Sequence, residues 1–127
     1  MLLLLDTHVF LWWTGDDPAL GPLARAAIAD RENLVFVSAA TAWEIAVKRA
    51  SGKLDAPGDI ADWVRQDGFA ELAIEIEHAA LSAELPNHHR DPFDRLLVAQ
   101  ARSEELTLVT SDPEIMQYDV EILDAGA

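Results

Sequence analysis

The sequence predicts an α/β fold in which a parallel β-sheet is covered by helices on both faces. Two observations lead to this prediction: short, unbroken apolar runs recur along the chain, and segments with helical character lie between them. Strands of a parallel sheet are buried on both faces and therefore appear as continuous apolar runs. With 127 residues, 50% of them hydrophobic, the chain is long enough for one substantial core. We predict a single domain over residues 1–127.

The elements follow in chain order. The run Leu2–Leu5, which stops at Asp6, predicts the first strand. Similar runs predict strands at Leu34–Val37 and Leu106–Val109, and weaker patterns predict strands at Phe69–Ile74 and Val120–Leu123. Helices are expected over Pro22–Ala29, Ala42–Ala50, Ile60–Arg65, His78–Leu85 and Phe93–Ser103. The pattern leaves the order of the strands open.

Composition excludes several classes of protein. The absence of cysteine excludes disulfides, a thiolate nucleophile and a cysteine-based metal site. The apolar start, Met1–Leu5, is too short for a signal peptide, and no stretch reaches the ~18 apolar residues of a membrane span. We therefore expect a cytoplasmic protein with no membrane association. A net charge of −14 argues against the basic surface of most nucleic-acid-binding proteins.

Four acidic residues are expected at one edge of the sheet. Asp6 ends the first strand, and Asp112 follows the strand that includes Leu106–Val109. Glu44 lies early in the helix after the second strand, and Asp94 begins the helix that leads back to Leu106. The carboxyl ends of parallel strands lie at one edge, where ligands bind. The four carboxylates therefore belong to the same edge of the sheet.

Helix capping is the competing explanation for each acid. Asp6 is placed to cap the segment that follows the first strand, and Thr41 and Glu44 fit a capping box. Asp91, followed by proline, fits an N-cap, as does Asp112. Capping does not require four carboxylates at one edge, however, and such a cluster repels itself unless cations are present.

A divalent metal ion resolves this repulsion. Mg²⁺ and Mn²⁺ prefer oxygen ligands, and bound ions of this kind promote phosphodiester cleavage by activating water. They also attract a phosphate backbone despite the negative net charge. Basic residues near two of the acidic segments are candidates for contacts with that backbone, or are solvated helix faces: Lys48, Arg49, Lys53, Arg90 and Arg95.

Four motifs in this order resemble a known family. Leu4-Leu5-Asp6-Thr7-His8, Trp43-Glu44-Ile45, the block from His89 to Leu97 (His-Arg-Asp-Pro-Phe-Asp-Arg-Leu-Leu) and Thr110-Ser111-Asp112 are similar to the acidic motifs of PIN domains. More narrowly, they resemble VapC-type ribonuclease toxins of type II toxin–antitoxin systems. The similarity runs from Leu2 to Asp112.

The resemblance implies a three-layer α/β/α fold with a largely parallel five-stranded sheet. It implies an endoribonuclease that uses Mg²⁺ or Mn²⁺, forms a homodimer and is neutralised by a VapB-like antitoxin protein. It assigns the metal-binding and catalytic roles to Asp6, Glu44, Asp94 and Asp112. Asp91 is expected to support the site or to cap a helix, and the hydroxyls of Thr7 and Ser111 either orient ligands or cap helices.

Histidine and tryptophan residues invite further hypotheses. His8, His88 and His89 do not have the spacing of a helical zinc site, and we interpret His88 and His89 as polar residues of a surface loop. One of Trp12 and Trp13 is expected to pack inward and the other to contribute to a dimer or antitoxin interface. Trp43 and Trp63 are predicted to belong to the core.

Two other functions fit parts of the sequence. In a phosphoryl-acceptor domain Asp6 would be phosphorylated, but such a site usually has a lysine near a later strand end and Thr107–Pro113 has none. In a non-catalytic partner-binding module the acids would only cap helices and attract a basic protein. A metal-dependent ribonuclease is the main hypothesis.

Overall fold

The computed structural model describes residues 1–56 and 58–127, and a single five-stranded sheet lies at its centre. The strands are arranged in the order β3-β2-β1-β4-β5, and all four neighbouring pairs are parallel. Their bounds are β1 Leu2–Leu5, β2 Leu34–Ser38, β3 Ala70–Leu72, β4 Thr107–Thr110 and β5 Ile122–Asp124. The predicted parallel sheet is confirmed, and each of the five predicted strands is present.

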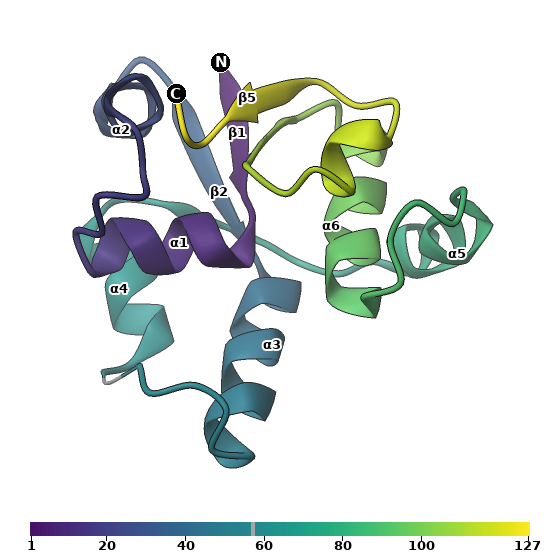
Figure 1. The fold of residues 1–127 in the computed structure, drawn as a ribbon, viewed down its shortest axis with the longest axis horizontal. Coiled ribbons are helices and arrows are strands. Elements are labelled where there is room, and N and C mark those ends of the chain that lie inside the picture. The colour runs from purple at the N-terminus through teal and green to yellow at the C-terminus, as the bar shows by residue number, and fades with distance from the viewer. Residues whose placement is uncertain (57) are drawn as a thin grey trace.

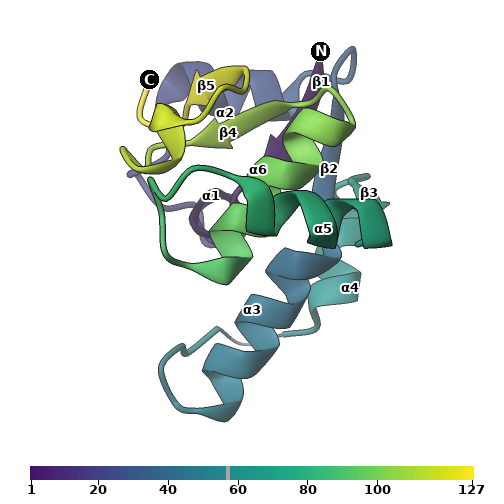
Figure 2. The same ribbon diagram turned by 90° about the vertical axis from the view of Figure 1, so that its right-hand side faces the viewer.

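Helices cover both faces of the sheet (Figures 1 and 2). The α-helices are α1 Thr7–Thr14, α2 Pro22–Ala29, α3 Ala39–Ala50, α4 Ile60–Gln66, α5 Ile76–Glu84 and α6 Pro92–Ser103, and a 3₁₀ helix spans Ile115–Gln117. Among the described residues, no helix has the length and apolarity needed to cross a bilayer.

The alternating side chains of β1 divide the core into two parts. Leu3 and Leu5 pack with residues of α1, α2 and α4, such as Phe10, on one face. Leu4 packs with residues of α6, such as Leu97, on the other face. Successive side chains of a strand point to opposite faces, so a strand that is apolar at every position has a helical layer on each side. The result is the predicted α/β/α arrangement.

The chain reverses its direction across the sheet at β1. It proceeds from β1 outward to β2 and β3, then returns over the other face to β4, which pairs with β1 in the register Leu5↔Val109. The crevice outside the carboxyl ends of the strands at such a reversal is where ligands bind in open α/β sheets. The ends of β1 and β4 therefore define one edge of the molecule as the place to look for a site, at the level of α1 and the start of α3 in Figure 1.

Helices α1 and α3 differ most from the prediction. Helix α1 was not among the predicted helices, because its eight residues make only about two turns and are too few to reveal a helical period. Helix α3 begins three residues before the predicted Ala42, because Ser38 is its N-cap and its hydroxyl accepts a hydrogen bond from the amide of Ala40.

Candidate metal-binding active site

Asp6 lies at the junction of β1 and α1, where it is almost fully buried. It is the N-cap of α1, with Oδ1 accepting a hydrogen bond of 2.8 Å from the amide of Val9. Oδ2 accepts a hydrogen bond from the hydroxyl of Thr110, which is the last residue of β4. Burial raises the pKa of Asp6 above its ordinary value, and the hydrogen bonds from Thr110 and Val9 only partly offset this effect. The cap therefore holds a carboxyl group that resists ionisation.

Asp94 and Asp112 converge on His89 from two directions. Nε2 of His89 lies 3.1 Å from Oδ2 of Asp94, in the first turn of α6, and 2.9 Å from Oδ2 of Asp112, after β4. One ligand atom from each of the three residues lies within 4.8 Å of the other two. Burial alone would lower the pKa of His89, but the hydrogen bond to Asp112 and the charges of Asp94 and Glu114 outweigh it and raise the pKa.

The pKa values of Asp94 and Asp112 are shifted in opposite directions. Burial, followed by the negative charge of Asp91, raises the pKa of Asp94 to about 7, and the charges of Glu44 and Asp6 act in the same direction. Burial also acts to raise the pKa of Asp112, but the hydrogen bond from His89 and the amide of Glu114 hold it below its ordinary value. The charged form of Asp94 is therefore disfavoured by burial first and by its acidic neighbours second, whereas the charged form of Asp112 is favoured.

Glu44 completes the acidic cluster from α3. Its side chain is 2% exposed, and Oε2 accepts a hydrogen bond of 2.5 Å from Nζ of Lys48, one helical turn later. This hydrogen bond, opposed by burial, raises the pKa of Lys48, and the charges of Asp91 and Asp94 add to it. Oε1 is buried and has no hydrogen-bond partner among the described residues. An unpartnered buried carboxylate oxygen is costly unless a cation or donor satisfies it.

These residues fit a hard divalent cation. The donors are carboxylate oxygens from Asp6, Glu44, Asp94 and Asp112, the ligand type that Mg²⁺ and Mn²⁺ prefer. Asp94 and Asp112 lie in the closest group, whereas Asp6 and Glu44 stand outside it but near enough for their charges to raise the pKa of Asp94. A bound cation would offset this repulsion and satisfy Oε1 of Glu44.

Comparison with known proteins agrees with this geometry. A family model described as "PIN domain" matches residues 3–121. The chain belongs to the PIN domain family. It is 29% identical to ribonuclease VapC22 of Mycobacterium tuberculosis over 118 aligned residues. The alignment covers 91% of this chain and 90% of that protein. It is also 38% identical over 60 residues to ribonuclease VapC16 of the same organism, covering 44% of this chain and 43% of that one.

Solved structures share the fold of this PIN domain. One is VapBC2 from Rickettsia felis bound to a promoter DNA fragment, with a TM-score of 0.67, 12% identity and coverage of 97% and 98% of the two chains. Another is VapBC-1 from nontypeable Haemophilus influenzae, with a TM-score of 0.66, 17% identity and coverage of 100% of both chains.

Capping accounts for some acids of the PIN domain and not for others. Asp91 is the N-cap of α6, and its Oδ1 accepts hydrogen bonds from the amides of Phe93 and Asp94. The capping box proposed for Thr41 and Glu44 is wrong, because α3 begins earlier and both residues lie inside it. Glu44 therefore has no capping role that would explain its burial.

Hydroxyl groups of the PIN domain also differ from expectation. The hydroxyls of Thr7 and Ser111 were expected either to orient ligands or to cap helices, and in the structure the hydroxyl of Thr7 bonds that of Thr41. Thr110, which sequence reasoning missed, donates to Asp6 and accepts from the amide of Asp112, so that one hydroxyl links two of the acids. Its place at the last position of a strand, two residues before an acid, is the signal that could have found it. Ser111 is half-buried between Thr110 and Asp112.

Two of the five basic candidates have their guanidinium groups packed against the rest of the chain. The guanidinium of Arg49 lies 5.3 Å from the ring centre of Trp63 and lines a cavity beside α4. That of Arg95 donates hydrogen bonds to the carbonyls of Ser82, Leu85, Pro86 and His89, so it orders the loop before α6. Lys48 contacts Glu44, and Lys53 and Arg90 are exposed. A contact of any of the five with RNA stays a prediction.

Two of the expectations for histidine and tryptophan residues, those for His89 and Trp43, are wrong. His89 is not a loop residue facing solvent, because its ring is largely buried between the acids, whereas His8 and His88 are exposed. Trp43 is 56% exposed and so does not belong to the core. Trp63 is partly buried against the core.

The adjacent tryptophans of α1 do not divide into one inward and one outward residue. Trp12 and Trp13 are both partly buried against the core, and Nε1 of Trp13 donates a hydrogen bond to Asp67. Their share in an interface stays a prediction.

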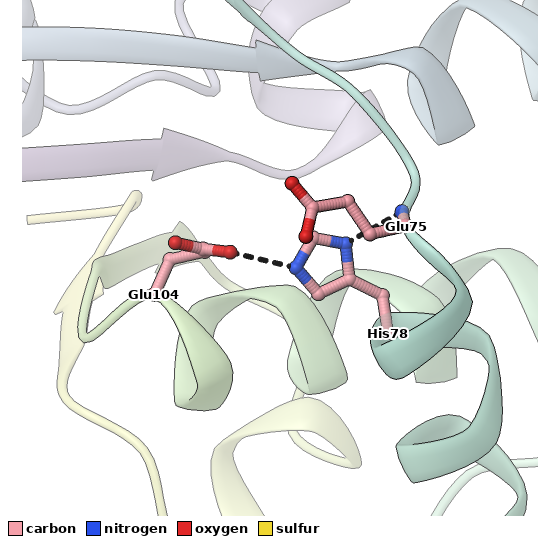
Figure 3. A group of neighbouring side chains, drawn as sticks. All are labelled: Glu75, His78 and Glu104. Atoms are coloured by element: carbon pink, nitrogen blue, oxygen red, sulfur yellow. Dashed lines mark hydrogen bonds and ion pairs between the residues drawn. The ribbon is translucent and has the colours of Figure 1, made fainter.

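A second group of metal-type side chains, Glu75, His78 and Glu104, joins α5 to α6 (Figure 3). Nδ1 of the fully buried His78 accepts a hydrogen bond of 3.0 Å from the amide of Glu75, and Nε2 lies 2.9 Å from Oε1 of Glu104. Because Nδ1 accepts, Nε2 carries the proton and donates it to Glu104. Neither ring nitrogen is free for a metal. The group therefore has a structural role, in which hydrogen bonds of His78 link the start of α5 to the end of α6.

The hydroxyl of Thr110 offers a test of how the site is organised. In Thr110→Val, Asp6 loses its hydrogen bond while the volume of the side chain is kept, and we expect metal affinity to fall by about 10- to 100-fold. Titration calorimetry with Mn²⁺ measures the change. Thr7→Val is the matched control, because it removes a buried hydroxyl that bonds only Thr41. Equal Mn²⁺ affinity in both variants and wild type would contradict the role of Thr110.

Proposed function

We propose that this PIN domain is a metal-dependent endoribonuclease that acts as the toxin of a VapBC-type toxin–antitoxin pair. The observation that carries the proposal is the cluster of four buried or half-buried carboxylates, one of them with an unpartnered oxygen, at the reversal point of the sheet. The similarity to ribonucleases VapC22 and VapC16 supports RNA as the substrate.

Asp6, Glu44, Asp94 and Asp112 would hold Mg²⁺ or Mn²⁺. When bound, the ion supplies positive charge that lowers the pKa of an attacking water and offsets the charge developing on the phosphate. Thr110 fixes the orientation of Asp6, and His89 holds Asp94 and Asp112 together. The candidates for contacts with the RNA backbone are Lys48, Arg49, Lys53, Arg90 and Arg95, and Lys48 already contacts Glu44.

A cognate antitoxin protein and a second copy of the chain are the proposed partners. Solved structures with this fold are described as VapBC complexes, which supports a VapB-like partner. The net charge of −14 favours a partner whose contact surface is basic. The homodimer expected from the resemblance belongs to the same proposal.

The phosphoryl-acceptor alternative is less favoured by the residues around the carboxyl end of β4. Such a site usually has a lysine near a later strand end, and Thr107–Pro113 contains none. The partner-binding alternative requires every acid to serve as a cap, and Glu44 does not.

The experiment that tests the proposed function is cleavage of cellular RNA by the purified protein, with 5′ ends mapped after reaction. We expect cleavage with Mg²⁺ or Mn²⁺, loss of cleavage with excess EDTA, and recovery when the ion is restored. Asp6→Asn should abolish it, because the amide keeps the size of the group and removes a negative ligand. Full activity in EDTA or in Asp6→Asn would refute the proposal.

A further inference from the structure

An aromatic pair, in which Trp43 is exposed and Phe93 is partly buried, directly precedes two of the acids in sequence. Trp43 on α3 and Phe93 on α6 have ring centres 4.8 Å apart, with an angle of 75° between their planes. Trp43 is 56% exposed, although an indole ring gains free energy when it is buried. In an edge-to-face contact at least one face of each ring is left uncovered by the other. The pair therefore offers an aromatic surface to a molecule outside the fold.

The position of the pair relates it to the site. Trp43 directly precedes Glu44, and Phe93 directly precedes Asp94, so each ring adjoins a different site acid in sequence. The contact between the two rings joins the helices that carry these acids. Lys48 lies on α3 one turn after Glu44 and contacts its carboxylate. Its positively charged ammonium group therefore lies near Glu44. A chain passing over Glu44 and Asp94 therefore passes close to the aromatic pair.

The charge of the protein indicates why an apolar contact would be needed. A protein that binds nucleic acid mainly through phosphate contacts needs many lysine and arginine residues, and this chain has nine against 23 acidic residues. Of these nine, Arg49 packs on the ring of Trp63, and Arg95 donates hydrogen bonds to backbone carbonyls of its own chain. Stacking of bases on aromatic side chains adds affinity without positive charge and tolerates any base, because every base has a π-face.

We propose that Trp43 and Phe93 form a stacking platform for a base of single-stranded RNA, next to the phosphodiester held at the acidic cluster. This inference rests on the proposed function and extends it to how the substrate is held. It also implies that the RNA is unpaired at this position, since a base inside a duplex does not expose its face to a side chain.

The test compares binding of two fluorescent oligonucleotides of equal length by fluorescence polarisation. One is single-stranded RNA of mixed sequence, and the other is an abasic sugar–phosphate chain with the same charge. EDTA is present so that neither is cleaved. We expect wild type to bind the RNA more tightly than the abasic chain, and Trp43→Ala to weaken RNA binding by about fivefold or more while leaving abasic binding unchanged. Trp43→Phe should recover most of the loss, and Trp43→Leu should not.

Leu23→Ala is the matched control, because Leu23 is an exposed apolar residue of α2 outside the site, and it should bind like wild type. In cleavage assays Trp43→Ala should raise KM and leave kcat within about threefold. Light scattering reports the oligomeric state of each variant. If Trp43→Ala instead changes the oligomeric state, the surface is a contact between copies and the inference is wrong.

Equal binding of RNA and the abasic chain by wild type would also overturn the inference, even if cleavage is intact. Failure of the proposed function would appear separately, as absence of metal-dependent cleavage in wild type. Base-dependent binding that is lost in Trp43→Ala would still identify a nucleic-acid surface in that case.

Discussion

Asp94→Asn is expected to make the metal-free protein more stable and, at the same time, to abolish RNA cleavage. Burial and the neighbouring acids raise the pKa of Asp94 to about 7, so at pH 8 the folded protein holds a charge that it would be more stable without. The amide has the same shape and no charge. We expect the free energy of unfolding at pH 8 to rise by roughly 2–4 kcal/mol, measured by chemical denaturation in EDTA. Under the proposed function, cleavage should fall by at least about 100-fold, because Asp94 is one of the proposed metal ligands.

Asp112→Asn is the matched control for this prediction. Asp112 belongs to the same group of ligand atoms as Asp94, but contacts with His89 and Glu114 hold its pKa below its ordinary value. Its charge is therefore favourable in the folded state, and the amide should leave the protein no more stable than wild type. Cleavage should be lost in both variants. A stability gain in both, or in neither, would mean that the repulsion is not concentrated at Asp94.

The stability of the metal-free protein should decrease as the pH rises from about 4 to about 8. Between pH 3.8 and about 7 the folded state keeps a proton on Asp94 that the unfolded state has released, so raising the pH favours unfolding. The raised pKa of Asp6 acts in the same direction. The contribution of Asp94 is fully present below pH 3.8 and is lost as the pH passes about 7, a change on the order of 4 kcal/mol.

Addition of Mn²⁺ should reverse this loss above pH 7. An ion present at about 100 times its dissociation constant stabilises the folded state by about 2.7 kcal/mol. Melting temperatures of wild type and Asp94→Asn, recorded with and without Mn²⁺ at pH 5 and pH 8, measure both effects. Wild type should gain most from Mn²⁺ at pH 8, and Asp94→Asn should gain little at either pH. A melting temperature of wild type that rises with pH in EDTA would contradict the expectation.

The sequence was sufficient to predict the sheet and the edge that carries the acids. Unbroken apolar runs such as Leu2–Leu5 have one strong explanation, a strand covered on both sides. The acids were predicted at one edge because parallel strands share a direction, whatever their order. Helix α1 was missed because eight residues, about two turns, are too few to reveal a helical period.

Details that depend on distant packing could not be read from the sequence. Whether a ring at the start of α3 faces solvent depends on where α6 lies, so Trp43 was wrongly assigned to the core and its contact with Phe93 was not foreseen. His89 lies between two acids because the loop before α6 is held by Arg95, and its neighbours in sequence give no sign of this. Such contacts join residues that are far apart in the chain, and no periodicity or motif in the sequence indicates that they meet.

The bond between Asp6 and Thr110 spans 104 positions, and its consequence concerns the order in which the acidic cluster is assembled during synthesis. A ribosome that has made only the first hundred residues has produced Asp6 and Glu44 but neither Thr110 nor Asp112. The strand β4, which pairs with β1 and leads into these two residues, is fourth of five in the order of synthesis. An unfinished chain therefore lacks the assembled acidic cluster. Under the proposed function, the messenger being translated is not cut until its translation is almost complete.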